Sequence, residues 1–284
     1  MKRIIQKSIV TGGITALALF GGIGPATAQE WNVEASGFFN HQNFENALSS
    51  EGYSIGVGYS QYLSRNWSIG LEVLFSQNQF KYSARPQGGS FTATDMDGDP
   101  FEFRYTSNFY HETDKWNSIQ IPLTIQFETK GKTRWYVRAG ALFNLLLKNG
   151  TSRTILGDLK TSGYYPQWDA ILSAPEYAGF GDFGYINRKR DIKFENNIFG
   201  VLESGLKWKI GSQKRQSIYL GAFLNIALTD MSPKNVTYGR LMEYTGDIKQ
   251  PLDYRDVWHQ EDLKNKKLQD YVFGIRLRYG FGNK

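Results

Sequence analysis

Three carboxylates at alternate positions form the first group in this chain that could bind a metal ion. Asp95, Asp97 and Asp99 lie in the segment Asp-Met-Asp-Gly-Asp. A calcium loop of the EF-hand type needs glycine at its sixth position and glutamate at its twelfth. Here the glycine is fourth and Thr106 is twelfth, so the spacing fails in detail. We interpret the segment as an acidic turn and predict neither a metal site nor a cofactor.

The three histidines, His41, His111 and His259, all fall in predicted loops. Glu112 follows His111 and Glu261 lies two residues after His259, so each pair could act in acid–base chemistry. Neither spacing fixes a nucleophile beside the histidine, and catalysis needs that geometry. We expect no catalytic residues and keep an enzyme as an alternative.

The segment 149–196 has the composition of a protein-binding surface, because it interleaves aromatic residues with glycines and a basic run. Aromatic residues and arginine are enriched where proteins are bound. The candidate binding residues are Tyr164, Tyr165, Trp168, Tyr177, Phe180, Arg188, Lys189 and Arg190. The same aromatic residues could instead pack the loops together as a cap, and the sequence leaves both interpretations open.

A further set of charged residues alternates with apolar ones. Its members are Glu34, Glu72, Arg138, Glu203, Lys207, Arg276 and Arg278. Glycine is frequent at the same alternate positions, as at Gly58, Gly140 and Gly221. Three acids and four bases can pair with one another if the fold encloses them, so the elements that carry them decide their role.

Eight segments of about ten residues alternate apolar and polar side chains, which is typical of strands in a transmembrane barrel. They span 31–40, 53–63, 67–75, 119–127, 135–147, 198–208, 218–228 and 271–281. The apolar sets of the last seven contain no charged residue. An Arg or Lys at mid-bilayer costs about 2–4 kcal/mol, so this absence favours a face in lipid.

The sequence therefore predicts an all-β fold: an eight-stranded antiparallel up-and-down transmembrane barrel with long extracellular loops. A soluble, lipocalin-like barrel would place the apolar set inside and the charged set in water. Glycine is poor on an exposed strand face but suits a narrow lumen. Since the interior of an eight-stranded barrel is just wide enough for side chains, we predict a charge network there.

The connections between these segments alternate in length. Those at 64–66, 128–133 and 211–216 are short, whereas those at 41–52, 82–115, 149–196 and 230–269 are longer. In an up-and-down barrel every second connection lies on the same side. The pattern predicts short periplasmic turns, long external loops that cap the barrel, and both ends of the barrel domain on the periplasmic side.

Aromatic residues near the segment ends predict girdles at the two membrane–water boundaries. The set toward the short turns is Trp31, Trp67, Phe127, Trp135, Trp208 and Phe281. The set toward the long loops is Phe39, Tyr53, Phe75, Trp116, Tyr271 and Phe273.

The first residues predict the compartment. Lys2, Arg3 and Lys7 precede an uncharged stretch that ends in Ala-Thr-Ala at 26–28, as in a secretory signal peptide. We expect a signal peptide at 1–28 and a barrel domain at 29–284. Its removal lowers the formal net charge from +6 to +3, and with no Lys/Arg-rich run we expect no nucleic-acid partner.

The strands resemble the PorT-like outer-membrane β-barrel family of Gram-negative bacteria. The matching residues are Ser118 to Ile125 around Ile121-Pro122-Leu123, Tyr136-Val137-Arg138-Ala139-Gly140, Phe199-Gly200-Val201 with Gly205-Leu206, Leu220-Gly221 with Asn225-Ile226, and Phe273-Gly274-Ile275 to Tyr279-Gly280-Phe281. The long loops and the tail Gly282-Asn283-Lys284 depart from the family pattern.

This resemblance implies an outer-membrane location, lipid and lipopolysaccharide as surroundings, and an architecture more than an activity. We expect a non-catalytic surface or envelope component associated with secretion or adhesion, with a surface protein as its partner. A small-solute channel and a lipid A-modifying enzyme remain the alternatives.

Overall fold

The structure is a computed structural model that describes residues 28–42, 46–48, 50–84, 87–211, 215–233, 237–260 and 270–282. All statements below refer to these residues. Residues 1–27 of the predicted signal peptide lie outside them. No helix in the described part of the chain is long and apolar enough to cross a membrane.

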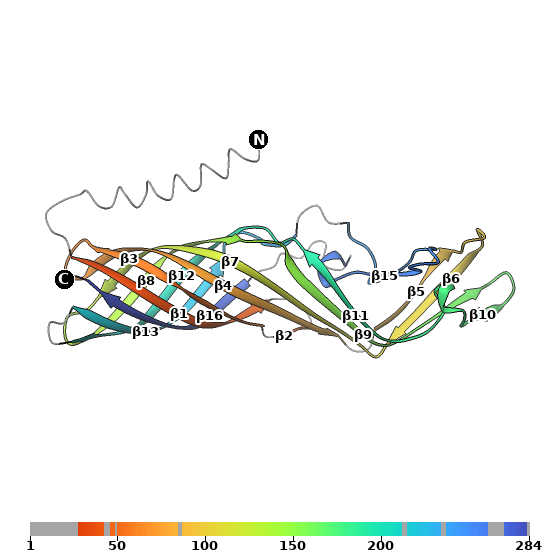
Figure 1. The fold of residues 1–284 in the computed structure, drawn as a ribbon, viewed down its shortest axis with the longest axis horizontal. Coiled ribbons are helices and arrows are strands. Elements are labelled where there is room, and N and C mark those ends of the chain that lie inside the picture. Colours follow the sequence, from red (N-terminus) through yellow and green to blue (C-terminus); the bar gives the residue numbers. More distant parts are fainter. Residues whose placement is uncertain are drawn as a thin grey trace, which may run out of the picture.

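Eight strands of the described chain close into an antiparallel barrel (Figure 1). They are β1 (Gln29–Gln42), β3 (Ser50–Tyr62), β4 (Trp67–Ala84), β7 (Phe109–Glu128), β8 (Thr133–Leu146), β12 (Asn197–Ile210), β13 (Gln216–Ala227) and β16 (Asp270–Phe281). Each pairs with the next, and β1 pairs with β16 to close the ring. The predicted eight-stranded up-and-down barrel is confirmed.

The two faces of the barrel follow the period-two pattern. On the outside, Val57 is 54% exposed, Leu202 51% and Ile275 63%, although all three are apolar. The residues that alternate with them along each strand point into the lumen, and most of these are buried. Because neighbouring side chains of a strand point to opposite faces, the apolar set faces lipid and the charged set is enclosed.

One residue of the predicted girdles lies elsewhere. Trp116 is buried at 5% exposure and its ring centroid is 4.9 Å from that of Phe194. Its assignment to the outer girdle was wrong, because the outward positions of β7 are odd-numbered and residue 116 therefore faces inward.

The short connections lie at one end of the barrel, where β1 begins and β16 ends (Figure 1). At the other end β4 and β7 run on past the barrel wall and stay paired as far as Ala84 and Tyr110. Nine residues of β7, 109–117, add about 30 Å at roughly 3.4 Å per residue. The long connections thus form a β-sheet extension, which we call the arm, and are not simply loops.

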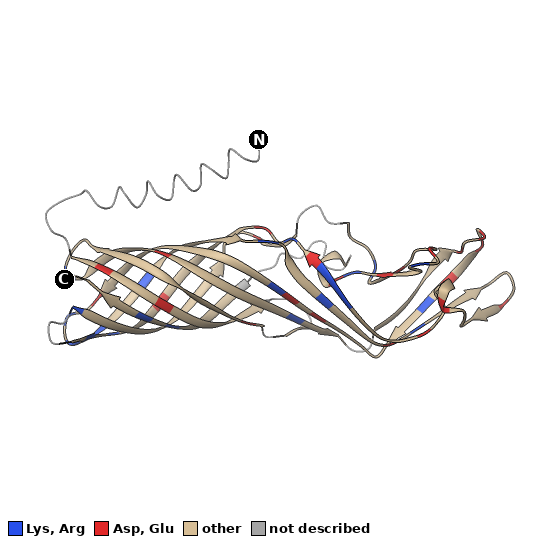
Figure 2. Cartoon of the chain, in the orientation of Figure 1, with Lys and Arg blue, Asp and Glu red and all other residues tan. Residues whose placement is uncertain are grey.

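Further strands complete the arm (Figure 1). They are β2 (Ala47–Leu48), β5 (Gln87–Thr94), β6 (Pro100–Ser107), β9 (Gly150–Tyr165), β10 (Ala170–Leu172) and β11 (Gly181–Ile192), with the hairpin β14 (Met242–Tyr244) and β15 (Leu252–Tyr254). Two short 3-10 helices are η1 (Glu176–Ala178) and η2 (Val257–His259). Charged residues are denser on the arm than along the barrel (Figure 2).

The arm has a hydrophobic core of its own. Phe101 and Phe103 of β6 pack with Phe180, and Met242 and Leu252 of the β14–β15 hairpin cover them. This core gives the sheet a folded partner layer, so the arm is an ordered element.

Candidate functional site: the barrel lumen and the arm

The lumen is built in layers, and strands β1 and β12 show the same order of inward residues along the barrel axis. Along β1, Glu30 and Glu34 are followed by Ser36, Phe38 and Asn40, all buried. Strand β12 repeats the order from the same end with Lys207, Glu203, Val201, Phe199 and Asn197. An ionic layer therefore lies toward the short turns, with an apolar layer and then an amide layer above it.

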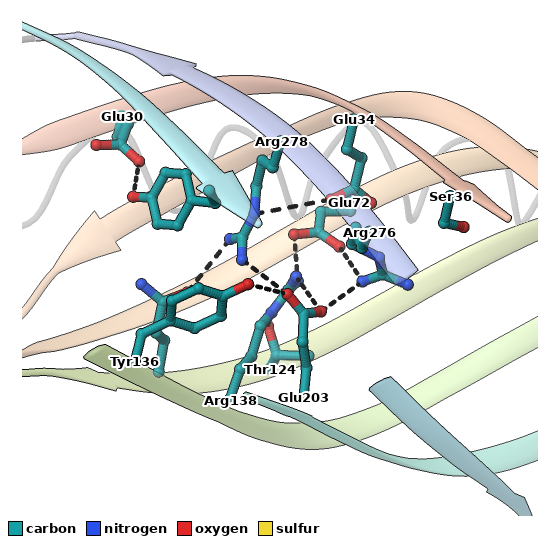
Figure 3. Close-up of polar contacts among 12 residues, drawn as sticks. Glu30, Glu34, Ser36, Glu72, Thr124, Tyr136, Arg138, Glu203, Arg276 and Arg278 are labelled. Atoms are coloured by element: carbon teal, nitrogen blue, oxygen red, sulfur yellow. Dashed lines mark hydrogen bonds and ion pairs between the residues drawn. The ribbon is translucent and has the colours of Figure 1, made fainter. Parts of the chain in front are cut away.

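Glu203 is the centre of the ionic layer (Figure 3). Its carboxylate is 3.0 Å from Nη1 of Arg276, 3.1 Å from Nη2 of Arg278 and 3.5 Å from Nη1 of Arg138. The hydroxyl of Tyr136 donates to it at 2.7 Å. Three cations and a neutral donor thus surround one buried carboxylate.

The other two acids of this layer complete the charge balance. Glu72 forms an ion pair with Arg138 and lies 3.9 Å from Nη1 of Arg276. Glu34 lies 4.0 Å from Nε of Arg278. Three glutamates and three arginines therefore meet in one network, as Figure 3 shows, and their formal charges cancel.

Lys207 belongs to a separate cluster nearer the short turns. Its Nζ is 3.1 Å from Glu30 and 3.2 Å from Glu128, and it donates to the hydroxyl of Tyr62 at 2.8 Å. Arg134 is 3.2 Å from Glu128. The structure thus divides the seven charged residues of the sequence-derived set: six lie together and Lys207 has other partners.

Several members of these clusters were not predicted from the sequence. Glu128 was placed in a turn and Tyr136 was named only for the family resemblance, while Glu30 and Tyr219 were given no role. The sequence did contain a signal for two of them. Glu30 lies four residues before Glu34 and Glu128 lies two after Gln126, and an even spacing along a strand places two side chains on the same face.

Glycine makes room for these large side chains. A Cβ atom added at Gly58 would collide with the side chain of Glu72, and one added at Gly221 would collide with the hydroxyl of Tyr136. These two inward-facing glycines therefore leave room for a bulky polar side chain from another strand.

The lumen is also filled above the ionic layer. Phe38, Leu142 and Phe223 form an apolar layer. Beside it a space of about 20 Å³ remains, lined by polar residues such as Asn40 and Asn78 and by apolar ones such as Phe199 and Trp116, which is close to the room needed for a single water molecule. A second cluster closes the arm end of the barrel: Phe80, Trp116, Ile192, Phe194, Met231, Val257 and Trp258.

The candidate binding residues of 149–196 fall into three groups. Tyr165 and Phe180 are buried in the arm core, so they pack the arm and offer no surface. Arg188 and Arg190 both pair with Asp253, whose single carboxylate offsets one of the three positive charges of the run, while Lys189 is exposed. Trp168 and Tyr177 are 60% and 61% exposed, and Tyr164 lies at the sheet surface under Arg104.

The acidic segment forms the turn between β5 and β6, as predicted. Oδ1 of Asp95 accepts from the backbone N–H groups of Asp97 and Asp99 at 3.0 and 2.9 Å. Among the histidines, His111 stacks beside Phe109 with 4.8 Å between centroids, and its side chain leaves β7 on the face opposite that of Glu112.

Two buried carboxylates tie the arm to the segment that carries η2. Glu112 accepts from the backbone N–H of Val257 at 2.8 Å, and Asp114 accepts from the indole N–H of Trp258. Burial raises the pKa of Asp114 to about 7. Burial, with the nearby charges of Asp114 and Asp256, raises the pKa of Glu112 well above its usual range. Both carboxyl groups lie above the membrane-spanning part of β7.

The profile of the outer membrane protein beta-barrel domain family matches residues 17–232, well over half of the chain. The chain belongs to this family. It is accordingly an outer-membrane β-barrel protein and lies in a lipid and lipopolysaccharide environment. A search of curated protein sequences gives no significant match.

Two solved structures show similarity to this chain over most of its length. Neisserial surface protein A has a TM-score of 0.35 at 9% identity, with 89% of this chain and 96% of that chain covered. Ail, the attachment invasion locus protein of Yersinia pestis, in complex with the heparin analogue sucrose octasulfate, has a TM-score of 0.30 at 8% identity, with 90% and 100% covered. These similarities are too weak to support an inference about binding or activity.

Proposed function

We propose that the protein is a non-catalytic component of the outer-membrane surface whose barrel anchors an interaction arm outside the cell, in a secretion- or adhesion-associated role. In this proposal residues 1–28 are a signal peptide, residues 29–284 are the barrel domain, and the PorT-like resemblance describes its subgroup. A surface or envelope protein is the partner.

The continuity of β4 and β7 is the observation that carries the proposal. Both strands pass from the barrel wall into the arm without a break, and they remain paired with each other on both sides of the rim. A binding surface on the arm is thereby held at a fixed height and orientation above the membrane. Short periplasmic turns and long external connections are the rule for such barrels, which supports an arm outside the cell.

The filled lumen supports an anchor over a channel. Ionic, apolar and aromatic layers follow one another along the axis, and an eight-stranded barrel has room only for such side chains. In planar bilayers we expect no conductance steps above background. Regular steps would favour the channel.

The alternative function, a lipid A-modifying enzyme, predicts a different result. His111→Ala or His259→Ala would alter the mass of lipid A while leaving barrel insertion intact. We expect lipid A of unchanged mass in both variants and in a deletion strain.

Surface labelling tests the position of the arm, since the chain contains no cysteine. Ser173→Cys lies on the exposed part of the arm, and Arg65→Cys lies in an exposed short turn at the other end. On intact cells a membrane-impermeant maleimide should label the first variant and not the second, which should react only after the envelope is opened. The reverse pattern would contradict the proposal.

A further inference from the structure

The end of the arm exposes large apolar side chains that no described residue covers. We define the arm tip as the turn 95–99 together with the segment 163–182. Within it Trp168 is 60% exposed, Ile171 59%, Leu172 41% and Tyr177 61%. Apolar residues gathered in this way outside the lipid-facing wall are characteristic of a binding surface.

The two segments of the arm tip are joined by specific contacts. The ring of Trp168 stacks on Tyr165 with 5.2 Å between centroids. The hydroxyl of Tyr165 donates to Asp95 Oδ2 at 3.0 Å, and that of Tyr164 donates to Asp169 at 2.9 Å. The acidic turn and the exposed aromatic residues therefore belong to one surface.

This surface is strongly acidic (Figure 2). Neither 91–103 nor 161–187 contains a Lys or Arg. The unpaired acids of the arm tip, none of which forms an ion pair with a described residue, are Asp95, Asp97, Asp99, Asp169 and Glu176.

Basic residues close to the arm tip are few. Arg104 is paired with Glu102 at 2.7 Å and Lys160 with Asp182 at 3.3 Å. Arg240 lies over the ring of Phe91 in β5. The negative charge of the tip is thus largely uncompensated.

We propose that the arm tip binds a cationic protein segment in which lysine or arginine residues are interspersed with apolar ones. This inference rests on the proposed function and names the class of its partner. Opposite charge attracts such a segment, and its cations can also lie on the faces of Trp168 and Tyr177, where cation–π contacts add attraction. Lipid phosphates and nucleic acids carry the same sign of charge as the tip and are repelled.

Peptide binding to the full barrel in zwitterionic nanodiscs tests the proposal. The probe is a fluorescent 12-residue peptide with six lysines and two leucines among glycines and serines, and its counterpart has six glutamates in place of the lysines. Fluorescence anisotropy should detect binding of the lysine peptide above that to empty nanodiscs, with an affinity that falls as salt is added. The glutamate peptide should not bind.

Two matched variants locate the site. Asp97→Asn with Asp169→Asn removes two charges from the arm tip, and asparagine suits the positive φ of 49° at residue 169. We expect the lysine peptide to bind this variant at least tenfold more weakly, and Trp168→Ala likewise. Asp191→Asn with Glu195→Gln removes two charges elsewhere on the chain and should keep the affinity within twofold.

Three results would overturn the inference. They are equal affinity for both peptides, unchanged affinity in the arm-tip variants, and stronger binding to phosphatidylglycerol vesicles than to the lysine peptide. If Ser173→Cys is labelled on intact cells while the lysine peptide does not bind, this inference alone fails. If Ser173→Cys is not labelled there, the proposed function fails.

Discussion

At the scale of single residues, charge balance decides what the lumen can hold. Glu203 is fully buried among three arginines, and with Glu34 and Glu72 it balances their charge. Taking a charge out of water costs several kcal/mol, and only close partners offset that cost. The network is therefore sensitive to the loss of any one member.

Glu203→Gln should lower the free energy of unfolding by about 3–5 kcal/mol, because it leaves buried arginines without their carboxylate. The measurement is urea unfolding in lipid vesicles followed by tryptophan fluorescence. Asp182→Asn, which breaks an exposed pair with Lys160, is the control and should keep the wild-type midpoint. Identical midpoints for both variants would count against a structural role for the network.

At the scale of elements, β7 serves two environments. Residues 118–128 contribute to the barrel wall, and Glu112 and Asp114 on the same inner face hold the segment with η2 against the arm. The groups facing this carboxyl pair are Tyr110 of β7, Ser152 of β9, and Asp256 with its neighbour His259. No lysine or arginine is among the groups that contribute most to the raised pKa of Glu112 or of Asp114.

Docking of this segment should weaken as pH rises. Burial raises the pKa of Asp114 from its usual 3.8 to about 7, so the protonated form is the one that docks. The stabilisation of docking by the protonated carboxyl group is complete below about pH 4, and it is lost as pH rises through about 7. Hydrogen exchange at Val257 and Trp258, corrected for intrinsic rates, should show less protection at pH 8 than at pH 5.

Asp114→Asn keeps an acceptor for the indole of Trp258 but removes the titration. In this variant the hydrogen-exchange protection at Val257 and Trp258 should depend less on pH than in the wild type. Asp191→Asn should behave as the wild type. Equal protection of the wild type at both pH values would refute the pH dependence.

At the scale of the whole molecule, the barrel closes without the arm. Strands β8 and β12 pair directly along Thr133–Asn144 and Asn197–Trp208, so the chain between them is not needed for the ladder. Replacing residues 150–192 by a short glycine-serine linker should leave an inserted barrel.

The measurement is the electrophoretic mobility of unboiled samples, which should still differ from that of boiled ones after this replacement. Removing β12 instead opens the ring and should abolish the difference. Loss of the folded band in the linker variant would mean that the arm is required for barrel closure.

The sequence predicted the barrel well because its signal is local. Alternation along a strand assigns each side chain to a face, and it correctly places Val57 on the outside and Glu72 in the lumen. The same rule also places Trp116 inside, because its position in β7 is even-numbered. The prediction of an outer-girdle residue relied instead on its closeness to a strand end. Register was not readable, because it depends on which residues of two strands lie opposite each other.

The sequence by itself determined which face meets lipid, how many strands close the ring and which connections share an end, since these follow from periodicity and chain order. Only the tertiary structure decided that Lys207 pairs with Glu30 and Glu128 and not with the arginine network's carboxylates. It also decided that Tyr165 and Phe180 lie in the core of the arm, whereas Trp168 and Tyr177 lie on its surface. The continuation of the long connections as a sheet was likewise visible only there. The physical reason is that these outcomes depend on pairings between strands far apart in the chain, where burial and charge neutralisation are settled by neighbours that no local pattern specifies.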